Sequence, residues 1–331
     1  MDERAPSRVA DVGELGLIQR VRTRLGRAPE GEVWAGDDTA VVNPESPAVL
    51  LTTDLLVEGV DFDTAYSNGG DVGWKVLAAS ASDIAAMCGR PRHAVVALGV
   101  PAVTTVRWVD EFLDGLMEAS AAWDVAVVGG DISAAEQIVV TVSMLGAPLR
   151  PSPVLRSGAR PGDTICVTGT LGAAAAGLIA LRSGAPRSDQ TVTRLIHRQL
   201  RPQARVSEAA ILAQFEISAM IDISDGLAVD LGHLLDESGV GCHIDEAAIP
   251  VDPDIPAGNG ADPFELALLG GEDFELLITM NGEQLEAASD GLGAVGTPLT
   301  AIGTVTADER RIGRRALDEW RSKGWEHLRS R

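Results

Sequence analysis

Residues 219–237 read AMIDISDGLAVDLGHLLDE and change their pattern at one turn. The first five residues are mostly apolar, which predicts a buried strand over 219–223. Ser-Asp-Gly at 224–226 is a turn signal, and apolar residues then recur at helical spacing, which predicts a helix over 226–237. A strand that feeds directly into a helix is typical of proteins that mix α and β structure.

The same alternation extends along the rest of the chain. Asp11 and Glu14 have the spacing of a capping box, which predicts an amphipathic helix that runs to about residue 25. The other predicted helices are 72–88, capped by Asp71, and 105–123, 172–182, 205–214 and 283–292. The other predicted strands are 39–42, 48–52, 93–100, 125–128, 138–145, 163–167, 242–244, 274–280 and 300–305. No repeat of about 20 to 50 residues occurs, which argues against a solenoid.

The length of the chain predicts two domains. At about 150 residues per domain, 331 residues correspond to roughly two, and 45% hydrophobic content is enough for two buried cores. Prolines at 148, 151, 153 and 161 mark a linker-like stretch, so the boundary is expected near residue 150. We therefore expect an α/β (mixed α+β) fold with domains at 1–150 and 151–331.

The chain is strongly acidic. Its 48 acidic and 27 basic side chains give a net charge of −21, which excludes most nucleic-acid binders. Residues 206–309 contain 21 acidic residues and no lysine or arginine. Most of these carboxylates belong to a solvated surface, but any that converge on one site require cations.

Several classes of protein are excluded by what the sequence lacks. It has no run of about 18 apolar residues, and its first 11 residues are too charged for a secretory signal, so we expect a cytoplasmic protein that does not bind membranes. Cys88, Cys166 and Cys242 are odd in number and far apart, which favours buried reduced thiols. Neither lysine follows a glycine, so no Walker A loop is present, and no Gly-x-Ser-x-Gly or His-x-x-x-His occurs.

Carboxylates beside small and hydroxyl residues recur five times. They are Gly36-Asp37-Asp38, Thr52-Thr53-Asp54, Ser82-Asp83, Gly129-Gly130-Asp131 and Asp222-Ile223-Ser224-Asp225-Gly226. A single example is usually a turn or a helix cap. Because ligand sites in α/β proteins gather where strands end, five examples also fit a convergent metal site, and spacing alone leaves both readings open. Oxygen ligands of this kind suit Mg²⁺, which would have to separate the carboxylates from a nucleoside triphosphate.

The order of these motifs closely resembles the thiamine-monophosphate kinase family, in the superfamily of aminoimidazole ribonucleotide synthetase. Further matching segments are Leu55-Leu56-Val57-Glu58-Gly59-Val60 and Gly270-Gly271-Glu272-Asp273-Phe274-Glu275-Leu276-Leu277, and the similarity runs from about Gly13 to Lys323-Gly324-Trp325. The resemblance implies ATP-dependent phosphorylation of thiamine monophosphate to thiamine diphosphate. It also implies a homodimer in which the N-terminal sheets pair into a barrel, and a C-terminal domain that closes over the nucleotide.

The resemblance also implies roles for individual residues. The magnesium ligands would be Asp38, Thr52, Thr53, Asp54, Asp83, Asp131, Asp222 and Asp225. ATP would be contacted by Gly130, Arg156 and Ser224, and the substrate by Asp61, Glu272 and Trp325. No catalytic base is assigned, because the acceptor phosphate is largely ionised near pH 7 and phosphoryl transfer depends mainly on positioning and charge neutralisation. Arg156 also reads as a solvated loop residue, and Trp325 as a core residue.

One position departs from the family, which usually has histidine where this chain has Asp61. The carboxylate would repel a phosphate, so it is either tolerated at the rim of the pocket or marks a changed acceptor. Two alternatives therefore stay open. One is another enzyme of the superfamily such as an aminoimidazole ribonucleotide synthetase, although Gly270-Gly271-Glu272-Asp273 and the terminal Lys-Gly-Trp favour the kinase. The other is a nucleotide-binding homologue with impaired catalysis.

Overall fold

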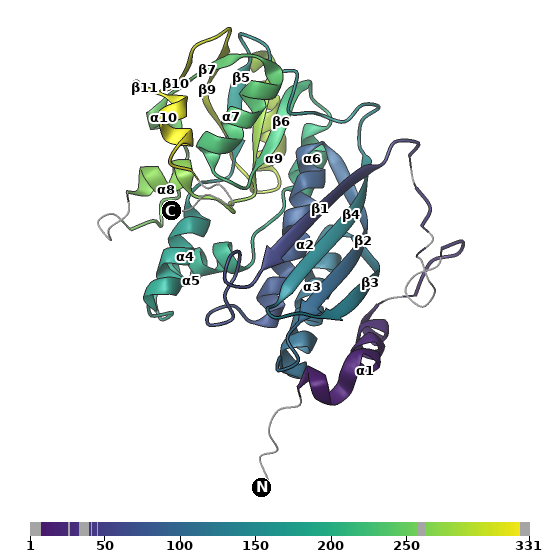
Figure 1. The fold of residues 1–331 in the computed structure, drawn as a ribbon. Helices are drawn as coiled ribbons and strands as arrows, with labels where there is room; N and C mark the ends of the chain where they lie inside the picture. The colour runs from purple at the N-terminus through teal and green to yellow at the C-terminus, as the bar shows by residue number, and fades with distance from the viewer. Residues whose placement is uncertain are drawn as a thin grey trace. The chain divides into compact units, whose positions relative to one another are not determined.

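The computed structural model describes residues 8–25, 27–32, 40, 42–44, 46–256 and 262–324. The chain forms two compact units (Figure 1). The N-terminal unit comprises Met1–Ile84 and Arg90–Ala147, and the C-terminal unit comprises Ala85–Gly89 and Pro148–Arg331. Each unit has its own sheet and helices, so the chain has a mixed α/β architecture of two parts.

The N-terminal unit is built on a four-stranded sheet in the order β1-β4-β2-β3. The strands are β1 (Leu50–Val57), β2 (Gly89–Val100), β3 (Ala126–Ala134) and β4 (Val139–Pro148). The helices are α1 (Val9–Arg24), α2 (Gly69–Ala86) and α3 (Val106–Trp123), and α2 and α3 lie together on one face of the sheet (Figure 1). Glycines allow α2 and α3 to pack closely, since a Cβ at Gly115 would overlap the backbone of Gly70.

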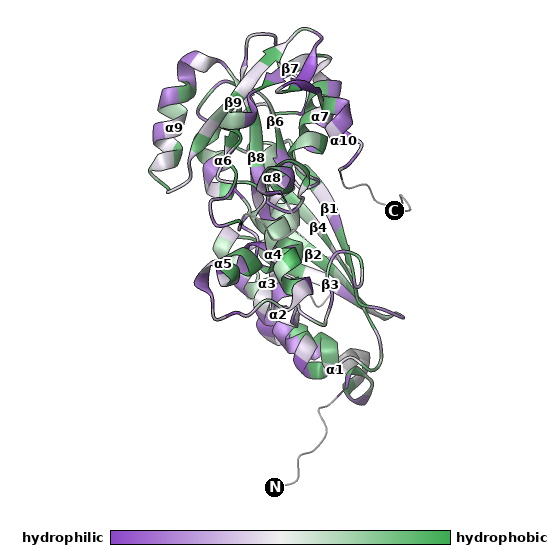
Figure 2. Cartoon of the chain, turned by 90° about the vertical axis from the view of Figure 1, so that its left-hand side faces the viewer, coloured by the Kyte–Doolittle hydropathy of each residue, from purple (hydrophilic) through white to green (hydrophobic). Residues whose placement is uncertain are grey.

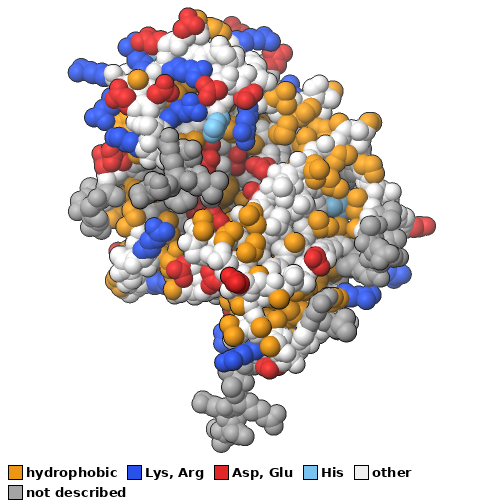
Figure 3. Space-filling model, viewed as in Figure 1, with side chains coloured by type: hydrophobic (Ala, Val, Ile, Leu, Met, Phe, Trp, Pro, Cys, Tyr) orange, Lys and Arg blue, Asp and Glu red, His pale blue; other side chains and the backbone are white. Residues whose placement is uncertain are grey.

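The other face of this sheet carries exposed apolar side chains. Side chains alternate between the faces of β1, so that Leu50 and Leu56 are buried while Leu51 and Leu55 are 73% and 54% exposed. Val95 of β2 is also exposed. Hydrophobic side chains gather over this sheet in the space-filling view (Figure 3). We call Leu51, Leu55 and Val95 the open apolar face.

The C-terminal unit contains a seven-stranded sheet in the order β11-β10-β7-β9-β5-β8-β6. Its strands are β5 (Thr164–Thr168), β6 (Ile217–Ile223), β7 (Gly241–Ile244), β8 (Glu275–Met280), β9 (Leu299–Thr306), β10 (Arg310–Ile312) and β11 (Arg315–Ala316). Its helices are α4 (Ala173–Ser183), α5 (Gln190–Leu200), α6 (Val206–Leu212), α7 (Leu227–Ser238), α8 (Pro263–Leu269), α9 (Leu285–Gly293) and α10 (Leu317–Arg321). Short 3₁₀ turns occur at Glu246–Ala248 and Gly282–Gln284.

Two of the apolar clusters in the C-terminal unit include residues of its sheet. In one, Leu231 and Leu235 of α7 and Trp320 of α10 pack with sheet residues such as Ile221. In the other, residues of α6 and α9 pack with sheet residues that include Ile278. The central strands are therefore hydrophobic along much of their length, as Figure 2 shows for β6 and β8. The sheet packs against two different sets of helices, and each set forms its own apolar cluster with it. This layered arrangement is expected of α/β proteins.

Most of the predicted helices and strands are confirmed, with ends shifted by a few residues. Three local predictions are wrong. The predicted turn at 129–131 lies inside β3, where a Cβ at Gly130 would overlap the carbonyl oxygen of Val96, so the glycine permits close strand packing. Asp11 is the third residue of α1 and accepts from the N–H of Arg8, which is the N-cap. The reciprocal bonds of Asp71 are with Asn68, one residue before α2 begins.

Three helices, α5, α8 and α10, and the two short strands β10 and β11 were not predicted. Of the predicted strand at 39–42, only Ala40 and Val42 are described, and neither is in a strand. The three cysteines are buried free thiols, as predicted. Within the described ranges, no helix is both long enough and apolar enough to cross a membrane.

Candidate active site

A pair of carboxylates lies between β1 and α2 in the N-terminal unit. The alternation of β1 places Thr52 and Asp54 on the same side of the strand, toward α2. The hydroxyl of Thr52 donates to Asp83 of α2, and Ser80 Oγ donates to Asp54 Oδ2 at 2.6 Å. The motifs at 52–54 and 82–83, separate in sequence, therefore meet in the fold.

The electrostatics of this pair favour a bound cation. Burial, and then the charge of Asp83, raise the pKa of Asp54 to about 6, although the hydrogen bond from Ser80 lowers it. Two carboxylates that oppose each other's ionisation, with a hydroxyl as the third group, form an all-oxygen donor set that suits a hard cation such as Mg²⁺. Among the described residues, no group of three His, Cys, Asp or Glu side chains is close enough to hold a metal.

Other predicted ligands in this unit lie apart from the pair. Thr53 is on the opposite side of β1, where Ser143 Oγ is 3.1 Å from its hydroxyl. Gly130 and Asp131 are on β3, at the other edge of the sheet from β1, so about three strand spacings, or roughly 14 Å, separate them from Asp54. Asp38 lies outside the described residues.

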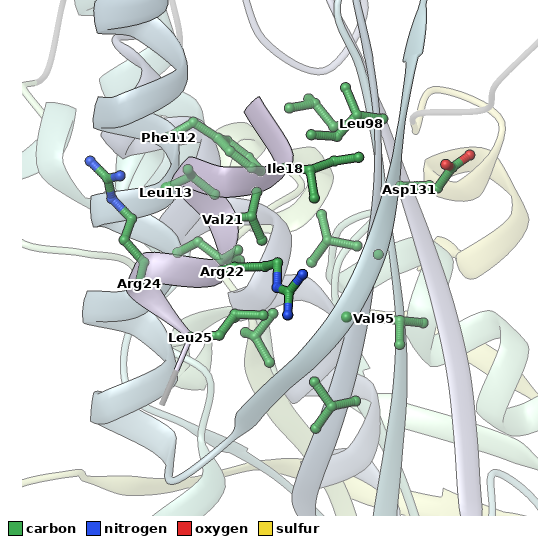
Figure 4. Close-up of a pocket in the computed structure, with 18 of the residues that line it drawn as sticks. Ile18, Val21, Arg22, Arg24, Leu25, Val95, Leu98, Phe112, Leu113 and Asp131 are labelled. Atoms are coloured by element: carbon green, nitrogen blue, oxygen red, sulfur yellow. The ribbon is translucent and has the colours of Figure 1, made fainter. Parts of the chain in front are cut away.

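An apolar pocket of about 620 Å³ lies in the N-terminal unit and reaches Gly130 and Asp131. Its walls come from α1, α3, β2 and β3, and Figure 4 shows Ile18 opposite Leu98, with Val21 and Leu25 further along the same wall. The side chain of Arg22 also extends into it. This pocket could not be predicted from the sequence, because apolar residues on one side of α1 are equally typical of a helix packed against a core.

In the C-terminal unit, the predicted ligands lie on the loop between β6 and α7. Asp222 is the penultimate residue of β6 and is buried, whereas Ser224 and Asp225, on the loop, are half-buried. A single oxygen, Asp230 Oδ2, accepts from the backbone N–H groups of Ser224, Asp225 and Gly226 at 3.1, 3.0 and 3.1 Å. Burial, and then the charges of Asp222 and Asp225, raise the pKa of Asp230 well above its ordinary value.

Glu272 lies on a second loop that is bonded to the first. Its N–H donates to the carbonyl oxygen of Ser224 at 2.8 Å, and the N–H of Phe274 donates to that of Ile223 at 2.9 Å. Glu272 and Phe274 both have positive φ, 67° and 50°. The buried amide of Gln199 on α5 donates to the Glu272 carboxylate. Gln199 was missed because α5 itself was not predicted.

The remaining predicted residues lie elsewhere. Arg156 is an exposed loop residue, and its backbone carbonyl oxygen accepts a hydrogen bond from Ser238 Oγ at 3.0 Å. Asp61 closes the turn after β1, since its Oδ2 accepts from the N–H of Val57 at 2.8 Å, and its carbonyl oxygen accepts from Lys75 Nζ at 3.3 Å. Trp325 lies outside the described residues.

The two-unit fold, with clustered carboxylates on β1 and α2 and an acidic loop after β6, corresponds to a known class of protein. The sequence matches the N-terminal domain of AIR synthase related proteins over residues 36–147 and their C-terminal domain over residues 160–314.

Individual relatives narrow this class. The chain is 36% identical to the thiamine-monophosphate kinase of Aquifex aeolicus (strain VF5), over 97% of this chain and all of that one. It is 36% identical to the thiamine-monophosphate kinase of Bacillus subtilis (strain 168), over 88% and 91% of the two chains. The solved structure of AaThiL complexed with AMPPCP and TMP has a TM-score of 0.76 and 34% identity, with 95% and 97% of the chains covered. The chain belongs to the thiamine-monophosphate kinase family.

Proposed function

We propose that this protein transfers the γ-phosphoryl group of ATP to thiamine monophosphate, which gives thiamine diphosphate and ADP. The observation that carries the proposal is the grouping of Asp54, Asp83 and the Thr52 hydroxyl between β1 and α2. Such a set repels a free nucleoside triphosphate and accepts one that carries metal ions. The acceptor is supported by relatives named thiamine-monophosphate kinase and by a neighbour complexed with AMPPCP and TMP.

We infer that Mg²⁺ is the metal. Several ions would be held, by Thr52, Asp54 and Asp83 in the N-terminal unit and, separately, by Asp222 and Asp225 in the C-terminal unit. Thr53 and Asp131 lie apart from the Asp54–Asp83 pair, so the family resemblance alone supports them, and Asp38, as further ligands. When bound, Mg²⁺ supplies positive charge that offsets the charge of the phosphates. The carboxylates hold that charge in place, and no side chain has to remove a proton from the ionised acceptor.

The pocket in the N-terminal unit suits the base of a nucleotide. Its walls are apolar, its volume of about 620 Å³ is within the range of small-molecule sites, and Gly130 and Asp131 lie at its margin. Ser224 and Arg156 would contact the phosphates, and the planar guanidinium of Arg156 suits such a contact. Glu272 would complement the positive thiazolium ring, on which Trp325 would stack.

The contacts of Asp61 argue against the alternative that this chain is a nucleotide-binding homologue with impaired catalysis. Its carboxylate accepts from the N–H of Val57 and so fastens the turn between β1 and α2. An aspartate with this local structural role is compatible with a working phosphate site nearby, because part of its hydrogen-bonding capacity is used by the backbone. We propose that Asp61 is a tolerated substitution.

We also propose a homodimer in which the N-terminal sheets pair. Leu51 and Leu55 on β1 and Val95 on β2 expose large side chains, although β4 lies between the two strands and Thr53 lies between the two leucines. Large apolar side chains exposed on one sheet are typical of an interaction surface. A second copy would cover it in the barrel that the family resemblance implies.

The function is tested by ADP release from Mg-ATP with thiamine monophosphate, free thiamine or an aminoimidazole ribonucleotide precursor as acceptor. Native protein and Asp61→His are compared. We expect the native protein to release ADP with thiamine monophosphate as acceptor and not with the other two compounds. Turnover only in Asp61→His would mean a different native acceptor, turnover on the aminoimidazole precursor would favour the related synthetase, and ATP binding without turnover in either protein would favour the impaired homologue.

A further inference from the structure

We propose that Asp230 is a positioning residue, which holds the loop at 224–226 in the conformation that binds metal and phosphate. The proposal deepens the proposed function and rests on it for the identity of the ligands. The observation is one buried carboxylate oxygen that accepts from three successive backbone N–H groups.

The geometry is that of an anion-binding nest filled by the protein itself. Successive backbone N–H groups that converge on one point form a concave site for an anion. Here the point is occupied by Oδ2 of Asp230, which is 2% exposed and lies in the first turn of α7. A carboxylate at this end of a helix is also stabilised by the helix dipole. The N–H groups are therefore directed into the protein, away from any external phosphate.

Fastening these three positions restricts the backbone that carries Ser224 and Asp225. Their side chains then have few torsions left with which to change direction. The same loop is bonded to the Glu272 loop through the carbonyl oxygen of Ser224, at 2.8 Å from the N–H of Glu272. Close packing strengthens this link, since a Cβ at Gly271 would lie 2.5 Å from the Ser224 oxygen. Asp230 thus acts directly on the loop at 224–226, where we propose metal binding. Through that loop it also acts on the Glu272 loop, where we propose substrate binding.

A role only as a helix cap does not account for these bonds. A cap satisfies N–H groups in the first turn of its own helix, whereas Asp230 accepts from the N–H groups of Ser224 and Asp225, which precede α7. One oxygen lies within 3.1 Å of all three donor nitrogens and so fixes the loop at three successive positions. This rigidity matters when a cation must find its oxygen ligands already in place.

The test compares Asp230→Asn, Asp230→Ala and, as a control, Asp236→Asn on the same helix. Asp236 bonds to Arg310 and Arg321 and does not contact the loop, so its replacement perturbs α7 without releasing residues 224–226. The measurements are Mn²⁺ binding to the nucleotide-free protein by calorimetry, hydrogen exchange of the 224–226 amides, melting temperature, and the Mg²⁺ dependence of turnover.

We expect Mn²⁺ affinity to fall about tenfold in Asp230→Ala, in line with the loss of other residues that orient metal ligands, and about threefold in Asp230→Asn. Exchange of the loop amides should accelerate in the same order. The Mg²⁺ concentration for half-maximal turnover should rise in parallel, with Asp236→Asn unchanged in all three despite a lower melting temperature.

The proposal is overturned if Asp230→Asn has the same Mn²⁺ affinity and the same exchange rates of the loop amides as native protein. If Asp230→Ala does not fold, Asp230→Asn alone decides the test. Equal losses in Asp236→Asn would overturn it as well, since they would reflect general destabilisation of α7. If Mn²⁺ binding and exchange change as expected but native protein does not phosphorylate thiamine monophosphate, the positioning role stands and the proposed function fails.

Discussion

Gly226 shows how one residue without a side chain shapes the candidate site. Its φ of 111° is in the region that favours glycine, and a Cβ there would lie 2.9 Å from the carbonyl carbon of Leu269. Gly239, at the other end of α7, also has positive φ, but a Cβ would meet no atom within 4 Å. Substituting each glycine by alanine therefore separates two free-energy costs. Both positions have the cost of a positive φ, and only Gly226 has the added cost of close packing.

We predict that Gly226→Ala lowers the free energy of unfolding by about 2–4 kcal/mol and Gly239→Ala by about 1 kcal/mol. Urea denaturation measures both values. Equal losses would mean that the loop can move away from Leu269 at little cost.

Glu208 provides a pH-dependent contribution to stability. Burial opposes its ionisation, but the hydrogen bond from Thr297 and the charge of Arg205 lower its pKa below the usual value. Because the folded pKa is lowered, the contribution is present above the ordinary glutamate pKa, near about 4.3, and is lost as pH falls through the folded value.

We predict that Glu208→Gln costs about 1.5–3 kcal/mol at pH 7, because a buried charged hydrogen bond is lost. The difference from native protein should shrink below about pH 4. Denaturation curves at both pH values test this, and a difference that stays constant would show that the ionisation of Glu208 contributes nothing.

Among the elements, α4 illustrates how a residue distant in sequence completes a helix. Its first residues have no cap on the helix itself, since Gly172 is at the N-cap position. Asp273 supplies the cap by accepting from the N–H groups of Gly172 and Ala174 at 2.6 and 3.1 Å. Burial raises the pKa of Asp273 to about 7, although these bonds and the charge of Arg198 lower it.

A raised folded pKa means that this contribution is complete below the ordinary aspartate pKa, near about 4, and is lost as pH rises through about 7. We predict that native protein loses at least about 1 kcal/mol more than Asp273→Asn between about pH 5 and pH 8. Thermal or urea unfolding across this range measures the difference. Parallel pH profiles for the two proteins would contradict the prediction.

At the scale of the whole molecule, the open apolar face is the surface through which we propose that two copies of the protein form a dimer. We predict that Leu51→Glu converts a dimer to monomers, since it places a charge at the most exposed large side chain of that face. Light scattering at micromolar concentration measures the mass. Val295→Glu is the control, because Val295 is exposed in the C-terminal unit. A native protein that is monomeric, or a Leu51→Glu variant that remains dimeric, would refute the proposed interface.

Local patterns were enough to predict the mixed α/β class and most of the strands and helices, whereas for the hydroxyl and carboxylate motifs spacing alone left a turn or helix cap open beside a metal site. These features depend on neighbours within a few positions, such as the apolar run at 219–223 followed by Ser-Asp-Gly. The family resemblance then assigned roles from the order of the motifs. The assigned roles of individual residues stay predictions.

Contacts between distant segments were decided by packing. Thr52 meets Asp83 while Thr53 turns away, because the pleat of β1 sends neighbours to opposite faces and α2 covers only one of them. The 129–131 segment continues as a strand, since pairing with β2 satisfies its backbone. Gln199 acquires its partner Glu272, 73 residues along the chain, only when α5 packs beside the loop that carries Glu272. Long-range pairings of this kind depend on the packing of whole elements, on which short sequence windows carry little information.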